Sequence, residues 1–166
     1  MSTEHPEFAK GTKKINKIAY VTKAFLMRES DRKIVVLTRS DNKKITPGRW
    51  EYSAGGAIDE GETPEIALRR EMMEEIKMET GDLDIFAAEG VYNHYTNNFD
   101  VLHYFFGFIK KNIKWFEKDE VKAVSYYSVA EINALIEKHG EDKFDLAYIP
   151  AFRKLEKYLK ERKIAH

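Results

Sequence analysis

Apolar and polar positions alternate along the chain in two patterns, one typical of strands and one typical of helices. Six runs rich in apolar, β-branched and aromatic residues predict strands of a half-buried or buried sheet. These runs are Ile18–Met27, Lys33–Arg39, Trp50–Ser53, Ile85–Val91, Val101–Ile109 and Val121–Tyr127. The run Val101–Ile109 is the most hydrophobic, and we therefore expect it in the interior of the sheet.

Three helices are predicted from their start signals. The first begins at Thr63-Pro64, where a threonine N-cap precedes a proline in the first helical position. The second opens with the capping box Ser128–Glu131 and runs to about Lys138. The third starts near Pro150 and is amphipathic, with its large apolar residues on one side.

The order of these elements predicts the fold class. Strands come first, then one helix, then more strands, then two helices. This order favours an α/β (α+β) fold with a mixed sheet sandwiched between helices, and it lacks the regular strand–helix alternation of a parallel doubly wound fold. Residues 1–14 are polar and lysine-rich and are predicted to form a flexible tail, whereas residues 15–166 have the length of one domain.

Composition excludes several function classes. The 28 basic and 28 acidic residues balance, so no overall field favours strong binding to nucleic acid or to an anionic membrane. The chain has no cysteine, which excludes disulfides, thiolate metal sites and a cysteine nucleophile. No apolar run resembles a signal peptide or a membrane span, so we expect a cytoplasmic protein that does not enter membranes.

The segment from Gly55 to Met78 carries the candidate chemistry. On its predicted helix, Glu71, Glu74 and Glu75 fall within one arc of about 100°. Like charges at these spacings repel one another, and a divalent cation removes that penalty. Mg²⁺ suits such a site because it binds hard oxygen ligands and bridges carboxylates to phosphates. Taken alone, the three glutamates also fit an ordinary exposed helix with a charged face.

The spacing over the whole segment distinguishes these two interpretations. The segment begins with Gly56, and five residues separate this glycine from Glu62. Seven further residues lead to Arg70-Glu71, which are followed by one apolar residue, one other residue and the pair Glu74-Glu75. This order resembles the Nudix box, G-x5-E-x7-R-E-U-x-E-E-x-G-U with U apolar. The approach to it, PGRWEYSAGGAIDEGE, is also similar to that family. The resemblance implies the family fold, a mixed sheet between helices with a loop–helix–loop catalytic motif.

One position departs from the family pattern. Lys77 stands where the box has its second glycine, and the expected apolar residue, Met78, follows it. That glycine ends the helix in a left-handed conformation, which costs another residue about 1–2 kcal/mol. We therefore expect the helix to continue for a further turn and to be capped by Gly81.

The resemblance also implies a role for each matched residue. Glu71, Glu74 and Glu75 would ligate Mg²⁺ or Mn²⁺, with help from the carbonyl of Gly56. Glu62 and Arg70 would form a structural pair. The implied reaction is hydrolysis of the diphosphate linkage in a small molecule, a nucleoside diphosphate linked to another group. The bound metal would lower the pKa of the attacking water.

Many members of the family use a further glutamate beyond the box as a base or as an extra metal ligand. The candidates are Glu117 and Glu120, of which Glu120, six residues before Tyr126, has the more favourable offset. A solvated charge in a turn is the alternative for either residue.

Residues outside the box provide candidate contacts to the substrate. Arg39 and Lys44 are candidates for the phosphates, and Trp50 and Tyr52 for stacking on a ring, although surface and core roles fit the same residues. Substrate choice is expected to depend on the loops 40–49 and 92–100.

Two other functions remain open. The stretch TRSDNKKITPGRWEYSAGG is similar to the isopentenyl-diphosphate isomerase branch of the superfamily, but that reaction needs a cysteine that this chain lacks. A Nudix-fold module that binds a nucleotide or a protein without turnover is the second alternative. The three motif glutamates argue against it, because a pure binder does not need them. The oligomeric state is open, with a homodimer as one expectation.

Overall fold

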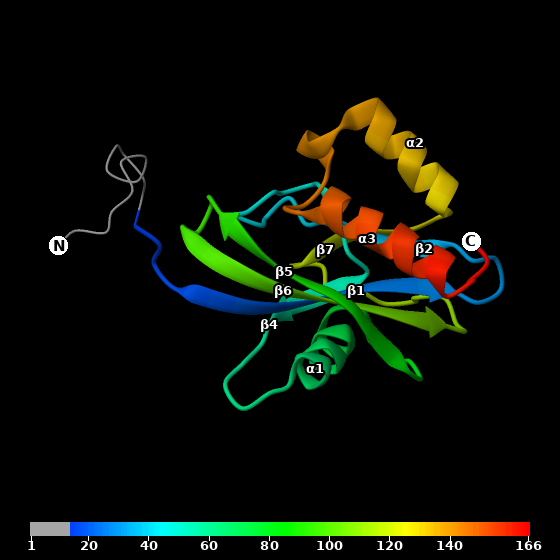
Figure 1. Cartoon of the computed structure of the whole chain (residues 1–166), viewed down its shortest axis with the longest axis horizontal. Helices are drawn as coiled ribbons and strands as arrows, with labels where there is room; N and C mark the ends of the chain where they lie inside the picture. Colours follow the sequence, from blue (N-terminus) through cyan, green and yellow to red (C-terminus); the bar gives the residue numbers. More distant parts are fainter. Residues whose placement is uncertain (1–13) are drawn as a thin grey trace.

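The computed structural model describes residues 14–166, so the tail predicted for residues 1–14 lies outside the described residues except for Lys14. Within this part of the chain, seven strands form one mixed sheet (Figure 1). They are β1 (Ile18–Arg28), β2 (Ile34–Arg39), β3 (Trp50–Glu51), β4 (Ala54–Ala57), β5 (Leu83–Asn93), β6 (Asn98–Ile109) and β7 (Val121–Tyr127). The helices are α1 (Pro64–Ile76), α2 (Val129–His139) and α3 (Tyr148–Glu161), with a short 3₁₀ helix at Glu141–Lys143. The six predicted strands and three predicted helices are confirmed, and β4 is an additional strand.

Strand β1 is the centre of the sheet. It pairs in parallel with β6 from Ile18 to Arg28, and β6 continues into an antiparallel pair with β5. The interior position predicted for the most hydrophobic run is therefore confirmed. On its other edge, β1 pairs first with β4 and then, at Met27, with β2. The sheet therefore forks between the first residue of β4, Ala54, and the first residue of β2, Ile34.

Ser53 fills this fork. Its hydroxyl accepts a hydrogen bond from the N–H of Leu26 (2.8 Å) and donates one to the carbonyl of Val35 (2.7 Å). The side chain is fully buried. One serine thus satisfies two backbone groups that the diverging strands leave without a ladder partner.

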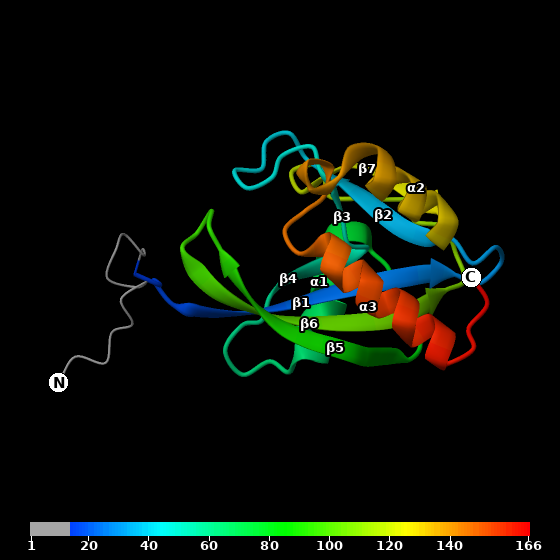
Figure 2. The same ribbon diagram turned by 45° about the horizontal axis from the view of Figure 1, so that its top comes forward.

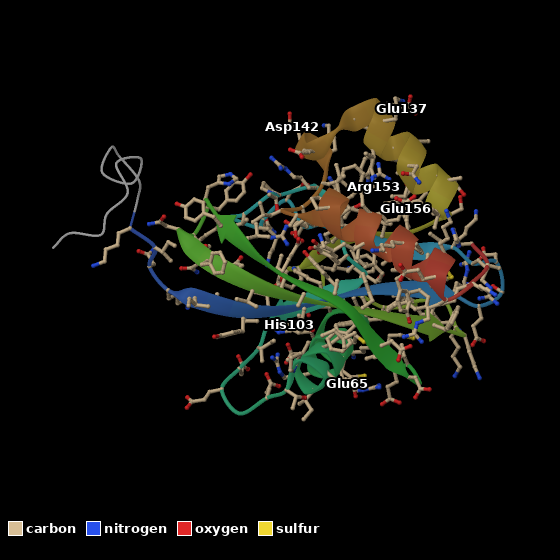
Figure 3. All side chains as sticks on the ribbon, in the orientation of Figure 1. Glu65, His103, Glu137, Asp142, Arg153 and Glu156 are labelled. Carbon is tan, nitrogen blue, oxygen red and sulfur yellow. The ribbon has the colours of Figure 1, made fainter. Side chains whose placement is uncertain are left out.

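The helices cover both faces of the sheet, which confirms the predicted mixed sheet between helices. Helix α1 lies on one face, whereas α2 and α3 lie on the other, with α3 running obliquely across β1, β6 and β5 (Figures 1 and 2). Helices α2 and α3 are joined by Arg153 and Glu156, which both contact Asn133 (Figure 3). None of the helices in residues 14–166 is long and apolar enough to cross a membrane.

A separate apolar core lies on each side of the sheet. Aromatic residues of the sheet pack against Phe152, Leu155 and Leu159 of α3 on one side. On the other side, Leu68 and Met72 of α1 pack against smaller strand residues. Each face of the sheet is therefore fixed against a helix, and α1 is held in one orientation relative to β4.

The predicted helix starts are confirmed, but the predicted end of α1 is wrong. Thr63 caps α1, and its side chain accepts a hydrogen bond from the N–H of Ile66. The helix does not continue to Gly81. It ends at Ile76, and Lys77 adopts the left-handed conformation (φ 47°, ψ 46°) that the family's glycine would adopt.

Three local contacts offset part of this strain. The N–H groups of Lys77 and Met78 both donate to the carbonyl of Met72. In addition, the ammonium of Lys77 lies over the Trp115 ring, 4.3 Å from its centroid. Cation–π contacts at exposed sites contribute about 0.5–1 kcal/mol, which offsets part of the cost of the left-handed lysine.

Candidate functional site

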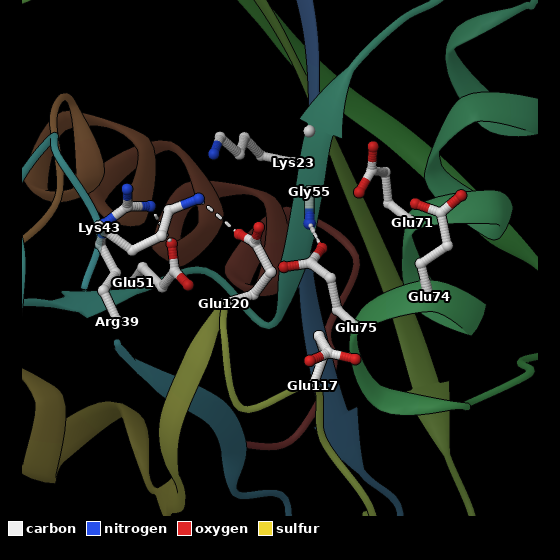
Figure 4. A pocket seen from close by; sticks show the side chains of 11 residues that line it. Lys23, Arg39, Lys43, Glu51, Gly55, Glu71, Glu74, Glu75, Glu117 and Glu120 are labelled. Carbon is white, nitrogen blue, oxygen red and sulfur yellow. Dashed lines mark hydrogen bonds and ion pairs between the residues drawn. The ribbon is translucent and has the colours of Figure 1, made fainter. Parts of the chain in front are cut away.

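A cavity of about 660 Å³ opens between α1, the fork of the sheet and the loop before β7 (Figure 4). Six glutamates, three basic residues and two glycines line it: Glu51, Glu71, Glu74, Glu75, Glu117 and Glu120; Lys23, Arg39 and Lys43; Gly55 and Gly56. The carboxylates outnumber the basic groups by two to one. The site is therefore acidic overall but has positive charges along one wall.

Glu75 is the most deeply buried of the motif glutamates. Its side chain extends from α1 toward β4, and one of its carboxylate oxygens accepts a hydrogen bond from the N–H of Gly55 (3.0 Å). Burial, followed by repulsion from Glu51, raises its pKa to about 8. A carboxylate held in such a place favours a nearby positive charge.

Glu71 is half-buried and lies directly against Gly56. A Cβ atom on Gly56 would lie 2.4 Å from the carboxyl carbon of Glu71, so any other residue there would displace this carboxylate. Burial raises the pKa of Glu71, although a hydrogen bond from Arg70 opposes the shift. Glu74, one turn further, is exposed at the mouth of the cavity and has a longer contact to Arg70 (3.4 Å).

Glu62 and Arg70 form a bidentate ion pair. Two guanidinium nitrogens of Arg70 each donate to a different carboxylate oxygen of Glu62, both at 2.8 Å. Arg70 also donates to the carbonyl of Ala57 (3.0 Å), and Glu62 accepts from the N–H of Asp59 (2.9 Å). The pair fastens the loop between β4 and α1 to the helix. The Arg70 hydrogen bond lowers the pKa of Glu62 to about 2.

The structure brings both Glu117 and Glu120 to the cavity. Glu120 pairs with the ammonium of Lys43. Glu117 is linked to α1 through its backbone, because its N–H donates to the carbonyl of Glu75 (2.8 Å). The cavity therefore contains the two alternatives that the sequence left open.

Of the four candidate substrate contacts, only Arg39 lines the cavity. Its guanidinium pairs with Glu51 (2.9 Å) and donates to the carbonyl of Ile45. Lys44 is exposed outside the cavity, Trp50 packs against Phe144, and Tyr52 is buried in the core. The structure does not bring these three residues into the cavity.

The sequence analysis missed Lys23 and Glu51. Lys23 is the single charged residue within the run IAYVTKAFLM, and Glu51 interrupts the short strand before Gly55. Burial raises the pKa of Glu51, and the charges of Lys23 and Arg39 oppose this shift. A charged residue inside an apolar strand was the signal that could have identified both, because burying it requires a partner.

The donor set of the cavity fits a divalent cation. Hard carboxylate oxygens are in excess over the basic groups, and Glu51 and Glu71 both lie close enough to repel the carboxylate of Glu75. Within residues 14–166, however, no three acidic or histidine side chains already converge into a metal site. Binding a cation would require the glutamates to change rotamers.

Comparison with known proteins identifies the family. The model of the NUDIX domain matches residues 19–149, and the chain therefore belongs to the Nudix family. It is 28% identical over 136 residues to Nudix hydrolase 3 of Arabidopsis thaliana, a match covering 74% of this chain and 16% of that protein. It is also 42% identical over 59 residues to a Nudix hydrolase of Deinococcus radiodurans, covering 36% of this chain and 34% of that protein. The matches thus span 16% and 34% of the length of these relatives.

Solved structures show the same fold. The crystal structure of DR0079 from Deinococcus radiodurans matches with a TM-score of 0.68, at 22% identity and 82% coverage of both chains. The MutT protein of Methanosarcina mazei Go1 matches with a TM-score of 0.67, at 22% identity, over 89% of this chain and 96% of that one. The NUDIX domain of Shewanella oneidensis NrtR, solved with ADP ribose, matches with a TM-score of 0.69, at 15% identity, over 95% and 94% of the two chains.

Proposed function

We propose that this protein is a metal-dependent hydrolase that cleaves the diphosphate linkage of a nucleoside diphosphate joined to another group. The observation that carries the proposal is the cavity itself, where six glutamates face three basic side chains. Carboxylates suit a divalent cation, and the basic wall suits the phosphate oxygens of the substrate. The family relationship supports the same reaction class.

The basic residues would bind and orient the diphosphate. Lys23, Arg39 and Lys43 lie together on one wall and provide positive charge for the phosphate oxygens. The glutamates Glu71, Glu74 and Glu75, with the carbonyl of Gly56, would hold Mg²⁺, or Mn²⁺ in its place. When bound, that ion supplies charge neutralisation at phosphorus and a lower pKa for a bound water.

The remaining step is the transfer of a proton from the attacking water. The water oxygen forms a bond to one phosphorus, and the bond between that phosphorus and the bridging oxygen breaks, which releases two phosphate products. We assign the proton to the carboxylate of Glu120, which Lys43 holds at the cavity wall. The Glu62–Arg70 pair positions the helix that carries the motif and does not touch the substrate.

Neither alternative function is favoured by an observation in the cavity. An isomerase of the isopentenyl-diphosphate type needs a cysteine, and the chain has none. A module that only binds would have no use for glutamates whose mutual repulsion destabilises the empty cavity.

A diphosphate panel tests the proposal. Purified protein is incubated with Mg²⁺ and ADP ribose, nucleotide sugars or dinucleotides, and product formation is followed by chromatography. We expect turnover of at least one compound, abolished by EDTA, and a fall of at least 100-fold in kcat for Glu75→Gln. Glu65→Gln is the matched control, because Glu65 is on the same helix, does not line the cavity and pairs with Arg69. Absence of turnover on the whole panel, or equal activity of Glu75→Gln and wild type, would refute the proposal.

A further inference from the structure

Lys23 reaches the cavity of the motif glutamates from the opposite face of the sheet. Its strand neighbours Phe25 and Met27 and its partner on β6, Tyr104, belong to the core on the α3 side. Because side chains alternate between the two faces along a strand, the Lys23 side chain starts on that side as well. The motif glutamates come from α1 on the other face. The lysine and the carboxylates therefore meet at the fork of the sheet (Figure 4).

Gly55 provides the path of the lysine side chain across β4. The two residues are partners on neighbouring strands, and a Cβ atom on Gly55 would lie 2.6 Å from Cδ of Lys23. The aliphatic part of the lysine therefore lies directly against the glycine, and a larger residue would displace it. The N–H of the same glycine donates to the carboxylate of Glu75 (3.0 Å). One glycine thus brings the lysine side chain and a motif carboxylate to the same place.

The ammonium of Lys23 is anchored on the α3 side of the sheet. It lies 3.9 Å from the carboxylate of Asp145 and 5.1 Å from the centre of the Tyr52 ring. Asp145 is fixed in turn, because it accepts a hydrogen bond from the hydroxyl of Thr46 (2.8 Å) and its N–H donates to the carbonyl of Trp50 (2.8 Å). Within residues 14–166, Asp145 is the one carboxylate within 4.0 Å of this ammonium. Lys23 therefore lines the cavity without a direct ion pair to a motif glutamate.

The charge of Lys23 nevertheless acts on three carboxylates of the cavity, those of Glu51, Glu71 and Glu75. Burial raises the pKa of each of these carboxyls, and the positive charge of Lys23 opposes the rise in every case. The same charge repels any divalent cation that the carboxylates bind. It attracts the phosphate oxygens of a diphosphate in the same cavity. Lys23 therefore acts with opposite sign on the two ligands of the cavity.

We propose that Lys23 makes the binding of the divalent cation depend on the diphosphate. Its ammonium weakens binding of the cation to the empty cavity, and the diphosphate removes this repulsion by pairing with the ammonium. The cation therefore binds mainly together with the diphosphate. Because coupling between two binding sites is reciprocal, the bound cation strengthens diphosphate binding by the same factor. The inference rests on the proposed function for the two ligands and adds the residue that links them.

Two titrations of Lys23→Met test the proposal independently of catalysis. Calorimetric titration with Mg²⁺ alone is done at pH 9, where Glu75, with its pKa of about 8, is largely ionised. We expect Lys23→Met to bind Mg²⁺ at least about fivefold more tightly than wild type, the lower end of typical couplings between sites. Inorganic pyrophosphate titrated in EDTA should bind the same variant at least about fivefold more weakly. Lys33→Met is the control, because Lys33 pairs with Glu131 outside the cavity, and it should change neither affinity.

The opposite directions of the two changes distinguish this role from others. A lysine that only stabilises the fold would weaken both ligands when replaced, and one that only binds phosphate would leave the affinity for Mg²⁺ unchanged. Either result, or no binding of either ligand to any form of the protein, overturns the proposal. Lys23→Gln, whose amide keeps a donor for Asp145, replaces Lys23→Met if that variant does not fold. If both titrations change as expected but no diphosphate is hydrolysed, the role of Lys23 stands and the proposed function fails.

Discussion

The backbone N–H of Glu117 donates a hydrogen bond to the backbone carbonyl of Glu75, over 2.8 Å. This bond joins the loop before β7 to the last turn of α1, and it brings two candidate bases beside the motif glutamates. Glu117 therefore has a structural role that depends on its backbone N–H and not on its carboxylate. Glu120 differs, because its carboxylate is held by Lys43 on the cavity wall.

This difference predicts unequal effects for two similar substitutions. Glu120→Gln should lower kcat about 10²–10⁴-fold, the usual contribution of a general base. Glu117→Gln keeps the backbone hydrogen bond and should change kcat by less than about threefold. Both are measured as steady-state kinetics with the best diphosphate found. The reverse order of effects would assign the proton transfer to Glu117.

The Glu62–Arg70 pair predicts a dependence of stability on pH. The folded-state pKa of Glu62 is about 2, lowered from an ordinary value of 4.5 mainly by the Arg70 hydrogen bond. A depressed carboxyl pKa contributes stability that is complete above about pH 4.5 and is lost as the pH falls toward 2. The difference in Tm between wild type and Glu62→Gln should therefore be constant above pH 5 and shrink below 4.5.

Calorimetry in EDTA measures that difference without interference from metal. Glu65→Gln is the control, since Glu65 has one exposed contact to Arg69 (3.4 Å). A Tm difference for Glu62→Gln that stays the same from pH 6 to pH 3 would contradict the assignment of this pair.

Ser53 at the fork of the sheet predicts a loss of stability that is larger than for an ordinary serine. Ser53→Ala leaves the N–H of Leu26 and the carbonyl of Val35 without a partner in a buried place. Each such group costs about 1–3 kcal/mol, so we expect at least that loss in the free energy of unfolding by urea. Ser125→Ala, at a partly exposed position of β7, should change it by less than about 0.5 kcal/mol. Equal effects of the two substitutions would show that the fork is satisfied in another way.

The left-handed Lys77 predicts a gain of stability on return to glycine. Lys77→Gly removes a cost of about 1–2 kcal/mol but also removes the contact to Trp115, worth about 0.5–1 kcal/mol. We expect a net gain near 1 kcal/mol, with turnover changed by no more than a fewfold because Lys77 does not line the cavity that holds the motif glutamates. In a Trp115→Ala background the gain should be larger. A loss of stability, or a large loss of turnover, would contradict this account.

Most of the local structure could be predicted from the sequence, whereas the nonlocal parts of the site could not. Strand runs and caps such as Thr63 and Ser128 depend on neighbouring residues, and the structure confirms them. Strand β4 contains only Ala and Gly, which have no strand preference. It forms because it pairs with β1, so its own sequence did not predict it. Lys23 and Glu51 meet the motif only because β1, β3 and α1 pack together. Lys77 was predicted wrongly, because helix termination there depends on Met72 and Trp115.

The excess of carboxylates in the cavity predicts opposite effects of one substitution with and without metal. In EDTA at a pH of about 9, where Glu75 with its pKa of about 8 is ionised, Glu75→Gln keeps a side-chain oxygen as the acceptor for the N–H of Gly55 but removes the cost of burying this charge and its repulsion from Glu51 and Glu71. Its Tm should therefore rise, by roughly 2–4 °C for each ~1 kcal/mol of burial cost and repulsion that is removed. With Mg²⁺ at about 100 times its Kd, wild type should gain about 2.7 kcal/mol, and Glu75→Gln should gain clearly less. Thermal melts with and without Mg²⁺ measure both effects. A variant that is less stable than wild type in EDTA would show that the carboxylate of Glu75 stabilises the fold by itself, and an equal gain with Mg²⁺ would exclude Glu75 as a ligand.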